Sequence, residues 1–302
     1  MRAVMDVGTN SVRLLVARRT PQGVEPLRRE IRIVRLGQGV DAAGRLNPEA
    51  VERTLKALQE LAALVPVGVP VRAFATSAVR DASNGREFAQ LAEERLGFPV
   101  EILSGPEEAQ LSFAGAAWSV RPIGLPEPIS VIDVGGGSTE IYTGLSSGEL
   151  LGGGSCQVGA VRMLERFITA HPLRPEEQLA MEEDIRRLLA PLAEKTMAYR
   201  PKTLIGVGGT ATSLAAIIQN MEEYSDEKVT GSALSLEDLR KAYARLGRLT
   251  LEERRKLPTL QPGREDVIVT GAAILIQAAE LSGFTEIYVS AWDLLYAGLG
   301  LP

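Results

Sequence analysis

The sequence contains very little cysteine and histidine, with one residue of each among 302. The single cysteine, Cys156, cannot form a disulfide within the chain, so a reducing compartment is the simplest expectation. The single histidine, His171, stands before an expected helix, where we expect a surface residue. One histidine largely excludes Ser-His-Asp catalysis and most zinc sites. Acid–base chemistry therefore falls to carboxylates.

Long apolar runs and positive net charge are also lacking. No run approaches the ~18–20 apolar residues of a membrane span, and the N-terminus enters strand-like sequence directly, so we expect a cytoplasmic protein without a membrane partner. The formal net charge is −5, which is untypical of a nucleic-acid-binding protein, and we expect no such partner. An anionic substrate is compatible with this charge if positive groups are concentrated in one cleft.

The expected secondary structure repeats once along the chain. Apolar alternation and helical periodicity predict the order β-β-β-α-β-α-β-α twice. Between the copies, 120–128 holds three prolines without periodicity and predicts a linker. We therefore expect a duplicated α/β fold with domain I at 1–122, domain II at 123–302 and a cleft between them. A last helix at about 291–302 could pack back on domain I.

Glycine-rich turns stand at the same place in both copies. The first copy reads 4-VMDVGTNSVRLLVA-17 and the second 131-VIDVGGGSTEIYTG-144. Glycine permits positive φ and lacks the Cβ that keeps a ligand from the backbone, and successive N–H groups in such turns form a nest for phosphate. A third stretch, 206-GVGGTATS-213, predicts glycines that open a helix, whose N-terminus also favours anions. A tight hairpin without a ligand is the alternative for either turn alone, but the repetition favours a phosphate-lined cleft.

Charged side chains accompany these turns. A carboxylate before each turn would repel phosphate directly, so we expect it to hold a hard cation that bridges to phosphate, and Mg²⁺ fits. Arg13 follows Ser11 by two residues, so strand alternation puts both side chains on one face. Arg80 is the second arginine expected near phosphate, because its planar fork can hold two oxygens; a surface ion pair is the alternative for each arginine. The expected phosphate-binding residues are Gly8, Thr9, Asn10, Ser11, Arg13, Arg80, Gly135, Gly136, Gly137, Ser138, Gly208, Gly209 and Thr210.

Several stretches, in order along the chain, resemble one family. They are 6-DVGTNSVRLLV-16, 34-VRLGQGV-40, 75-ATSAVRDASNGREF-88, 104-SGPEEAQLSFAG-115, 133-DVGGGSTE-140, 206-GVGGTATSLA-215 and 263-GREDVIVTGAAIL-275. Together they resemble the exopolyphosphatase / guanosine pentaphosphate phosphohydrolase (Ppx/GppA) family, within the actin-like, sugar-kinase and heat-shock ATPase superfamily. The resemblance implies two ribonuclease H-like domains, hydrolysis of terminal phosphate from inorganic polyphosphate or guanosine pentaphosphate, and a homodimer.

The resemblance also implies residue roles. It makes the second Glu of SGPEEA, Glu108, the general base, whereas an exposed helical Glu is the alternative. Glu107 has capping-box spacing from Ser104, so its expected role is to close the helix start. A metal and phosphate site is implied at Asp133, Gly135 and Glu140, with Asp6 facing it from the other half.

Two departures from the family pattern stand at the C-terminal end. Members often carry an arginine-containing stretch after the final strand, where this chain has 289-VSAWDLLYAGLG-300 without arginine. Longer members carry further helical domains that extend a polyphosphate channel. This chain stops after the two-domain core, so a processive grip on very long polyphosphate is less expected.

Two rival functions are open at this point. An ATP-dependent kinase or actin-like ATPase would share the paired phosphate turns, but the SGPEEA and ATSAVR stretches match the phosphohydrolases instead. A degenerate member would bind guanosine tetra- or pentaphosphate without hydrolysing it, and the intact Glu108, Asp133 and Glu140 argue against this. The first hypothesis is therefore a Mg²⁺-dependent exopolyphosphatase.

Overall fold

A computed structural model describes residues 1–20 and 23–300. By their contacts they form two compact units. The first runs from Met1 to Leu111 and takes in the segment that begins at Leu294, and the second is Ser112–Asp293. The boundary predicted at 122–123 falls later in the chain than this division, and as a statement about domains it stays a prediction.

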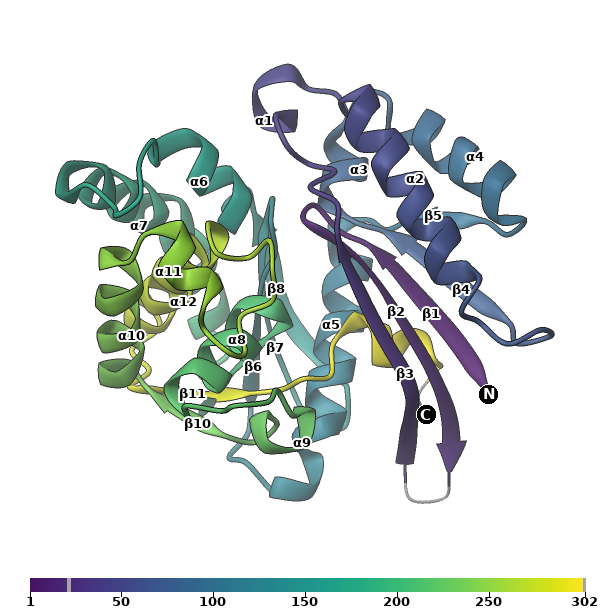
Figure 1. Ribbon diagram of the computed structural model, residues 1–302. Coiled ribbons are helices and arrows are strands. Elements are labelled where there is room, and N and C mark those ends of the chain that lie inside the picture. The colour runs from purple at the N-terminus through teal and green to yellow at the C-terminus, as the bar shows by residue number, and fades with distance from the viewer. Residues whose placement is uncertain (21–22, 301–302) are drawn as a thin grey trace. The chain divides into compact units, whose positions relative to one another are not determined.

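The first unit is built on a five-stranded sheet of order β3-β2-β1-β4-β5 (Figure 1). Its strands are β1 (Arg2–Val7), β2 (Ser11–Thr20), β3 (Gly23–Ile33), β4 (Val71–Ala75) and β5 (Val100–Ile102). β1 is antiparallel to β2 and parallel to β4. Met5 and Val7 belong to the buried core on one face, so alternation places Asp6 on the opposite face.

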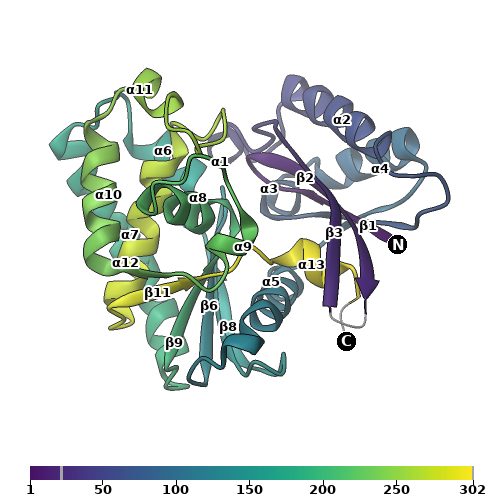
Figure 2. The ribbon, with the colours of Figure 1, turned by 60° about the horizontal axis from the view of Figure 1, so that its bottom comes forward.

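Helices cover both faces of this sheet. The two longest on the face of Met5, α2 (Pro48–Ala62) and α4 (Gly85–Leu96), contribute the core residues Leu58 and Phe88. On the other face lies α13 (Leu294–Gly298), where a Cβ on Gly298 would meet a Phe74 ring carbon at 2.7 Å (Figure 2). The short helices are α1 (Val40–Ala43) and α3 (Ser77–Asp81), and α5 (Gly105–Val120) runs from this unit into the next.

The second unit is built on a six-stranded sheet of order β10-β11-β9-β6-β7-β8. Its strands are β6 (Ile129–Val134), β7 (Thr139–Gly144), β8 (Leu150–Cys156), β9 (Thr203–Val207), β10 (Ala233–Ser235) and β11 (Glu286–Val289). β6 is antiparallel to β7 and parallel to β9, as β1 is to β2 and β4. The repetition confirms the predicted duplicated α/β plan.

Two hydrophobic cores flank the second sheet. Ile132 and Ile141 pack with the long helices on one face, whereas Val131 packs with Phe113 and Ala117 of α5 on the other. The helices of this unit are η1 (Arg121–Ile123), α6 (Ala160–Phe167), α7 (Pro175–Met197), α8 (Gly208–Ile218), α9 (Asp226–Val229), α10 (Leu236–Arg248), α11 (Leu251–Arg255) and α12 (Val267–Leu281). Alternation therefore places Asp133 on the face that α5 covers.

Among the described residues, every helix is too short or too polar to traverse a bilayer as a single span.

Candidate active site

The first glycine turn joins β1 to β2, and two of its carbonyl groups accept hydrogen bonds from the segment that follows β3. Gly8 N donates to Ser11 O at 2.9 Å and closes the turn. The carbonyls of Thr9 and Asn10 accept from backbone N–H groups of residues 34–37, each at 2.9 Å. Within residues 1–20 and 23–300, no group accepts a hydrogen bond from the N–H of Thr9 or Asn10. The turn therefore presents donors, as an anion nest requires.

Asp6 and Arg13 form an ion pair across this hairpin. They are directly opposite in the β1–β2 ladder, and Asp6 is only 4% exposed. Arg13 Nε donates to Asp6 Oδ2 at 2.8 Å, and Arg13 Nη2 lies 2.7 Å from the same oxygen. A buried carboxylate needs such compensation. The sequence assigned Asp6 to metal and Arg13 to phosphate; the structure brings the two together, and both roles stay predictions.

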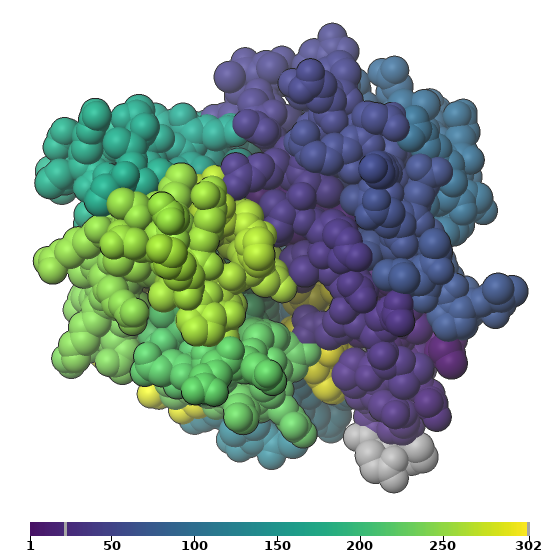
Figure 3. All heavy atoms as spheres, in the orientation of Figure 1, coloured from purple at the N-terminus to yellow at the C-terminus, as the bar shows by residue number. Residues whose placement is uncertain are grey.

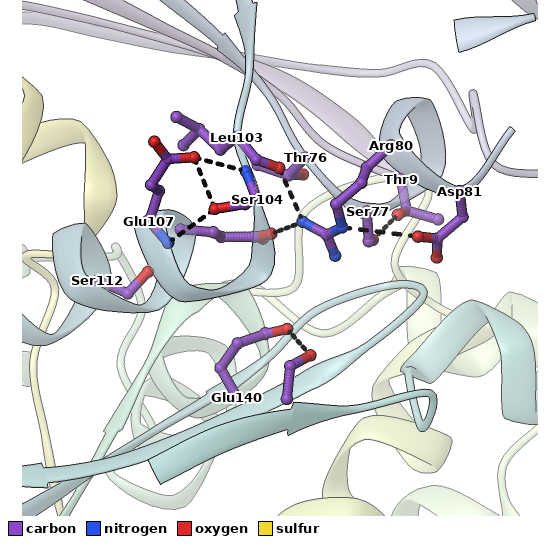
Figure 4. A network of polar contacts seen from close by, with 12 residues as sticks. Thr9, Thr76, Ser77, Arg80, Asp81, Leu103, Ser104, Glu107, Ser112 and Glu140 are labelled. Carbon is purple, nitrogen blue, oxygen red and sulfur yellow. Dashed lines mark hydrogen bonds and ion pairs between the residues drawn. The ribbon is translucent and has the colours of Figure 1, made fainter. Parts of the chain in front are cut away.

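The first turn is also tied to α3, whose last turn carries Arg80. The hydroxyls of Thr9 and Ser77 are 2.9 Å apart (Figure 4). Arg80 Nη1 donates to Glu108 Oε2 at 2.6 Å and to Leu103 O at 3.2 Å. Glu108 is half-buried rather than freely exposed. The predicted base and a predicted phosphate ligand are thus held against each other within the first unit.

Glu107 closes the start of α5. Its Oε2 accepts from Ser104 N at 2.9 Å and from Ser104 Oγ at 2.6 Å, and its N–H donates to Ser104 Oγ at 3.4 Å. These bonds, from the hydroxyl first and then the backbone, lower the pKa of Glu107. The capping role predicted for Glu107 is confirmed, so the two adjacent glutamates have different partners.

The second glycine turn, between β6 and β7, repeats the plan of the first. Gly135 N donates to Ser138 O at 3.0 Å. The carbonyls of Gly135 and Gly136 accept from backbone N–H groups of residues 160–162 at 2.9 to 3.1 Å. No described residue accepts from the N–H of Gly136 or Gly137. Both turns therefore have carbonyls tied to a flanking segment and N–H groups left as donors.

The start of α6 reaches this turn because Gly159 has no side chain. A Cβ on Gly159 would lie 2.4 Å from Gly136 O, although its φ of −141° is ordinary extended backbone. Arg162 Nε also donates to Gly137 O at 2.7 Å. The N-terminal N–H groups of α6 thus find partners in the turn instead of a side-chain cap.

Asp133 and Glu140 are directly opposite in the β6–β7 ladder, which puts both side chains on one face of the sheet. Ser112 Oγ donates to Asp133 Oδ2 at 2.9 Å. Ser155 Oγ donates to Glu140 Oε1 at 2.6 Å, and Figure 4 marks this bond at the labelled Glu140. Glu140 is 3% exposed. Two like charges that lie directly opposite each other on neighbouring strands destabilise a sheet, and burial of the carboxylates adds a desolvation cost. A bound cation would offset both.

The start of α8 borders Asp133. Gly208 has φ 76°, and a Cβ there would lie 2.7 Å from Asp133 Oδ1. A Cβ on Gly209 would lie 1.8 Å from Arg264 Nη1, so the guanidinium rests on the first turn of this helix. Val207 supplies no side-chain cap. The third glycine stretch therefore meets a carboxylate on one side and an arginine on the other.

The residues of the second unit fit Mg²⁺. Over the described part of the chain, no three His, Cys, Asp or Glu side chains gather closely enough to hold a metal by themselves. Mg²⁺ commonly uses one or two carboxylates and keeps water and phosphate oxygens as further ligands. Asp133 and Glu140 provide hard carboxylate oxygens on one face of the sheet. Gly208 lies beside Asp133 and has no side chain there.

The lone cysteine lies next to this acidic pair. Burial first, and then the charge of Glu140, raise the pKa of the Cys156 thiol to about 12. Its Sγ donates to Thr139 O at 3.6 Å. The thiolate is the nucleophilic form of cysteine, so at neutral pH this thiol is inert.

Comparison with known proteins identifies the family. Residues 15–294 match the Ppx/GppA phosphatase family. This chain belongs to that family. It is 37% identical over 308 residues to exopolyphosphatase 2 of Mycobacterium tuberculosis, covering 97% of this chain and 95% of that protein. The resemblance inferred from the sequence is therefore confirmed, and the protein is a phosphatase of the Ppx/GppA family.

Solved structures of the same family share the fold. An exopolyphosphatase from Cytophaga hutchinsonii is similar with a TM-score of 0.88 and 29% identity, covering 99% of this chain and 96% of that chain. The Ppx/GppA family member of Aquifex aeolicus is similar with a TM-score of 0.81 and 30% identity, covering 98% and 95%. The predicted α/β class, with one sheet in each of two units, is confirmed. The assignment to ribonuclease H-like domains of the actin-like superfamily stays a prediction.

Three residues of the candidate site were not predicted from the sequence. Ser112 and Ser155 orient the acidic pair, and Gly159 lets α6 reach the second turn. The spacing of Ser112 could have indicated it, because Ser112 follows Glu108 by four residues and so lies on the same face of the helix. Ser155 and Gly159 become visible only once β8 pairs with β7 and α6 packs on the turn.

Proposed function

We propose that this Ppx/GppA phosphatase is an exopolyphosphatase that releases terminal phosphate from inorganic polyphosphate. The observation that carries the proposal is the repeated turn: in each unit, glycine-rich backbone has its carbonyls bound and its N–H groups available as donors. Two such turns suit a substrate with many adjacent phosphates. The names of the Mycobacterium tuberculosis and Cytophaga hutchinsonii relatives support this substrate.

The helix α5 carries residues of the proposed site, and it runs from the first unit into the second. Its first turn carries Glu108, and Ser112, four residues later on the same helical face, donates to Asp133. The helix would thus connect the proposed base with the acidic hairpin.

Glu108 is the proposed general base. Its carboxylate accepts the proton of the attacking water, the terminal anhydride P–O bond breaks, and the shortened polyphosphate leaves with the bridging oxygen. Arg80 orients Glu108 through the 2.6 Å contact. When phosphate arrives, its oxygens compete for the same guanidinium, so Arg80 is placed to serve both groups.

The remaining groups of the proposed site bind and orient phosphate. The N–H groups of both turns and the start of α8 donate to phosphate oxygens, and they need no reorganisation as charge develops. Asp133 and Glu140 would hold Mg²⁺, oriented by the serine hydroxyls described above. Mg²⁺ bound there would neutralise charge on the phosphate oxygens.

A substrate series tests this function. Phosphate release is measured with polyphosphates of several lengths, guanosine pentaphosphate and ATP, each with and without Mg²⁺. We expect Mg²⁺-dependent release from polyphosphate at the highest kcat/KM and little release from ATP. A higher kcat/KM with guanosine pentaphosphate would instead make the chain a guanosine pentaphosphate phosphohydrolase. Binding of guanosine tetra- or pentaphosphate without any release would indicate a non-hydrolysing member.

The same preparation tests two further proposals. Sedimentation or light scattering shows whether the chain is the homodimer that the family resemblance implies. Localisation of a tagged chain tests the cytoplasmic assignment. A monomer at assay concentration would contradict the first, and an extracellular location would contradict the second.

A further inference from the structure

The single histidine of the chain is not the surface residue that the sequence predicted. His171 lies between α6 and α7 and is half-buried, and its Nδ1 is 3.1 Å from Arg254 Nη1. An arginine in the guanidinium form has no acceptor, so Arg254 must donate and His171 must accept. The contact therefore requires a neutral imidazole with an unprotonated Nδ1.

Arg254 is a fully buried arginine that links separate segments of the second unit. Its residue is 0% exposed. Nε donates to Leu246 O at 2.8 Å, and Nη1 donates to Glu265 O at 2.8 Å as well as facing His171. Burial lowers the pKa of Arg254 to about 10, so it remains charged at neutral pH. A buried cation of this kind is costly unless its acceptors stay in place.

The backbone that Arg254 binds is the segment 263–266, which carries Arg264. Glu265 reinforces this segment, because its Oε2 accepts from Gly263 N at 2.6 Å and its Oε1 accepts from Arg255 Nε at 2.8 Å. The residues before and after Arg264 in the chain are thus both held by hydrogen bonds. Its guanidinium rests on Gly209, at the start of α8.

We propose that Arg254 and His171 position Arg264 over the start of α8, and that protonation of His171 weakens phosphate binding there. The inference rests on the proposed function, which places substrate phosphate at this helix start. Figure 3 shows the teal surface around the α6–α7 connection against the yellow-green surface around α11. Neither residue contacts the proposed substrate, so both are positioning residues.

The charged groups facing His171 determine the direction of the effect. They are Arg254 from α11, Asp266 at the N-cap of α12 and Glu177 in the first turn of α7. Burial first, and then Arg254, lower the pKa of His171, while the two carboxylates oppose this in part. Because the pKa in the folded chain is below the ordinary value near 6.5, the contact is intact above that pH. It is lost as the pH falls through the lowered pKa.

The test compares the wild-type chain with His171→Asn across pH 5.5 to 8. The Asn carbonyl can accept from Arg254 as Nδ1 does, but it does not take up a proton in this range. Both enzymes meet the same substrate, so titration of polyphosphate cancels in the ratio of their KM values. We expect the ratio of wild-type KM to His171→Asn KM to rise about threefold to tenfold toward pH 5.5, with a smaller change in kcat.

A second measurement follows the histidine itself. Because the chain has one histidine, its imidazole gives a single NMR titration, which reports the pKa directly. Arg254→Met removes the facing charge, so the pKa of His171 should rise toward its ordinary value. Arg254→Gln serves if the methionine variant does not fold, since glutamine also removes the facing charge. The exposed Arg245→Met is the matched control and should leave the titration unchanged.

The outcomes separate the two proposals. Absence of phosphate release by the wild-type chain would contradict the proposed function. Normal release with a KM ratio that stays flat from pH 8 down through the His171 pKa that NMR reports would overturn the positioning inference alone. An NMR pKa of His171 that is the same in the wild type and the Arg254 variants would also overturn it, whatever the turnover.

Discussion

At the scale of single residues, the two units differ at one position of the repeated hairpin. The residue opposite the aspartate that precedes each turn is Arg13 in the first hairpin and Glu140 in the second. Asp6 therefore has an arginine as its cross-strand neighbour, whereas Asp133 has a second carboxylate. In the proposed function, Mg²⁺ bound at the second hairpin would offset the charge of this acidic pair.

This difference predicts how Glu140→Gln responds to Mg²⁺. Mg²⁺ that binds the folded chain and not the unfolded chain raises the free energy of unfolding by RT ln(1 + c/Kd), where c is the concentration of free Mg²⁺. We expect the wild-type melting temperature to rise with added Mg²⁺ and the rise to disappear in Glu140→Gln. Without Mg²⁺ the variant should be at least as stable as the wild type, because a like charge is gone. Exposed Glu223→Gln is the control, and a full Mg²⁺ response in Glu140→Gln would argue against this metal site.

At the scale of elements, the second turn depends on how closely α6 approaches it. Three N–H groups at the start of α6 bind the turn carbonyls, and this leaves the N–H groups of Gly136 and Gly137 as donors. Only a residue without a side chain fits at Gly159, which lies in extended backbone. The donor geometry of the turn is therefore set by a helix that follows it in the chain.

Replacement of Gly159 by alanine tests this dependence. The added Cβ would meet Gly136 O at 2.4 Å, so α6 must move away from the turn. We expect a loss of about 1–3 kcal/mol in the free energy of unfolding and a higher KM for polyphosphate. The matched control is Gly247→Ala in α10, where nothing lies within 4 Å of the new Cβ. It should be neutral or up to about 1 kcal/mol more stable, because alanine favours a helix. Equal stability and KM in both variants would refute the dependence.

Much of the order of helices and strands could be predicted from the sequence, because the spacing of apolar residues reflects which side chains each element buries. The hairpins and the capping box of Glu107 follow from alternation and from local spacing. β10 was not predicted, since three residues are too few for a period and its strand exists through pairing with β11. The Arg254–His171 contact could not be predicted either, because it joins residues 83 apart in the chain.

At the scale of the whole molecule, the two units carry different parts of the proposed chemistry. The first contributes Glu108 and Arg80 together with a neutral hairpin, and the second contributes the acidic hairpin and the start of α8. In the proposed function, turn N–H groups would bind phosphate, whereas proton transfer would depend on Glu108 alone. Loss of the base should therefore abolish turnover and spare binding.

The most direct test is phosphate release by Glu108→Gln beside Glu107→Gln, with Mg²⁺-dependent polyphosphate binding measured for each. Gln can replace Glu in a capping box, so Glu107→Gln should turn over as the wild type does. Glu108→Gln should bind polyphosphate and lose about 10²–10⁴-fold in kcat, the usual contribution of a general base. Wild-type turnover by Glu108→Gln, or equal loss in the folded Glu107→Gln, would contradict this account.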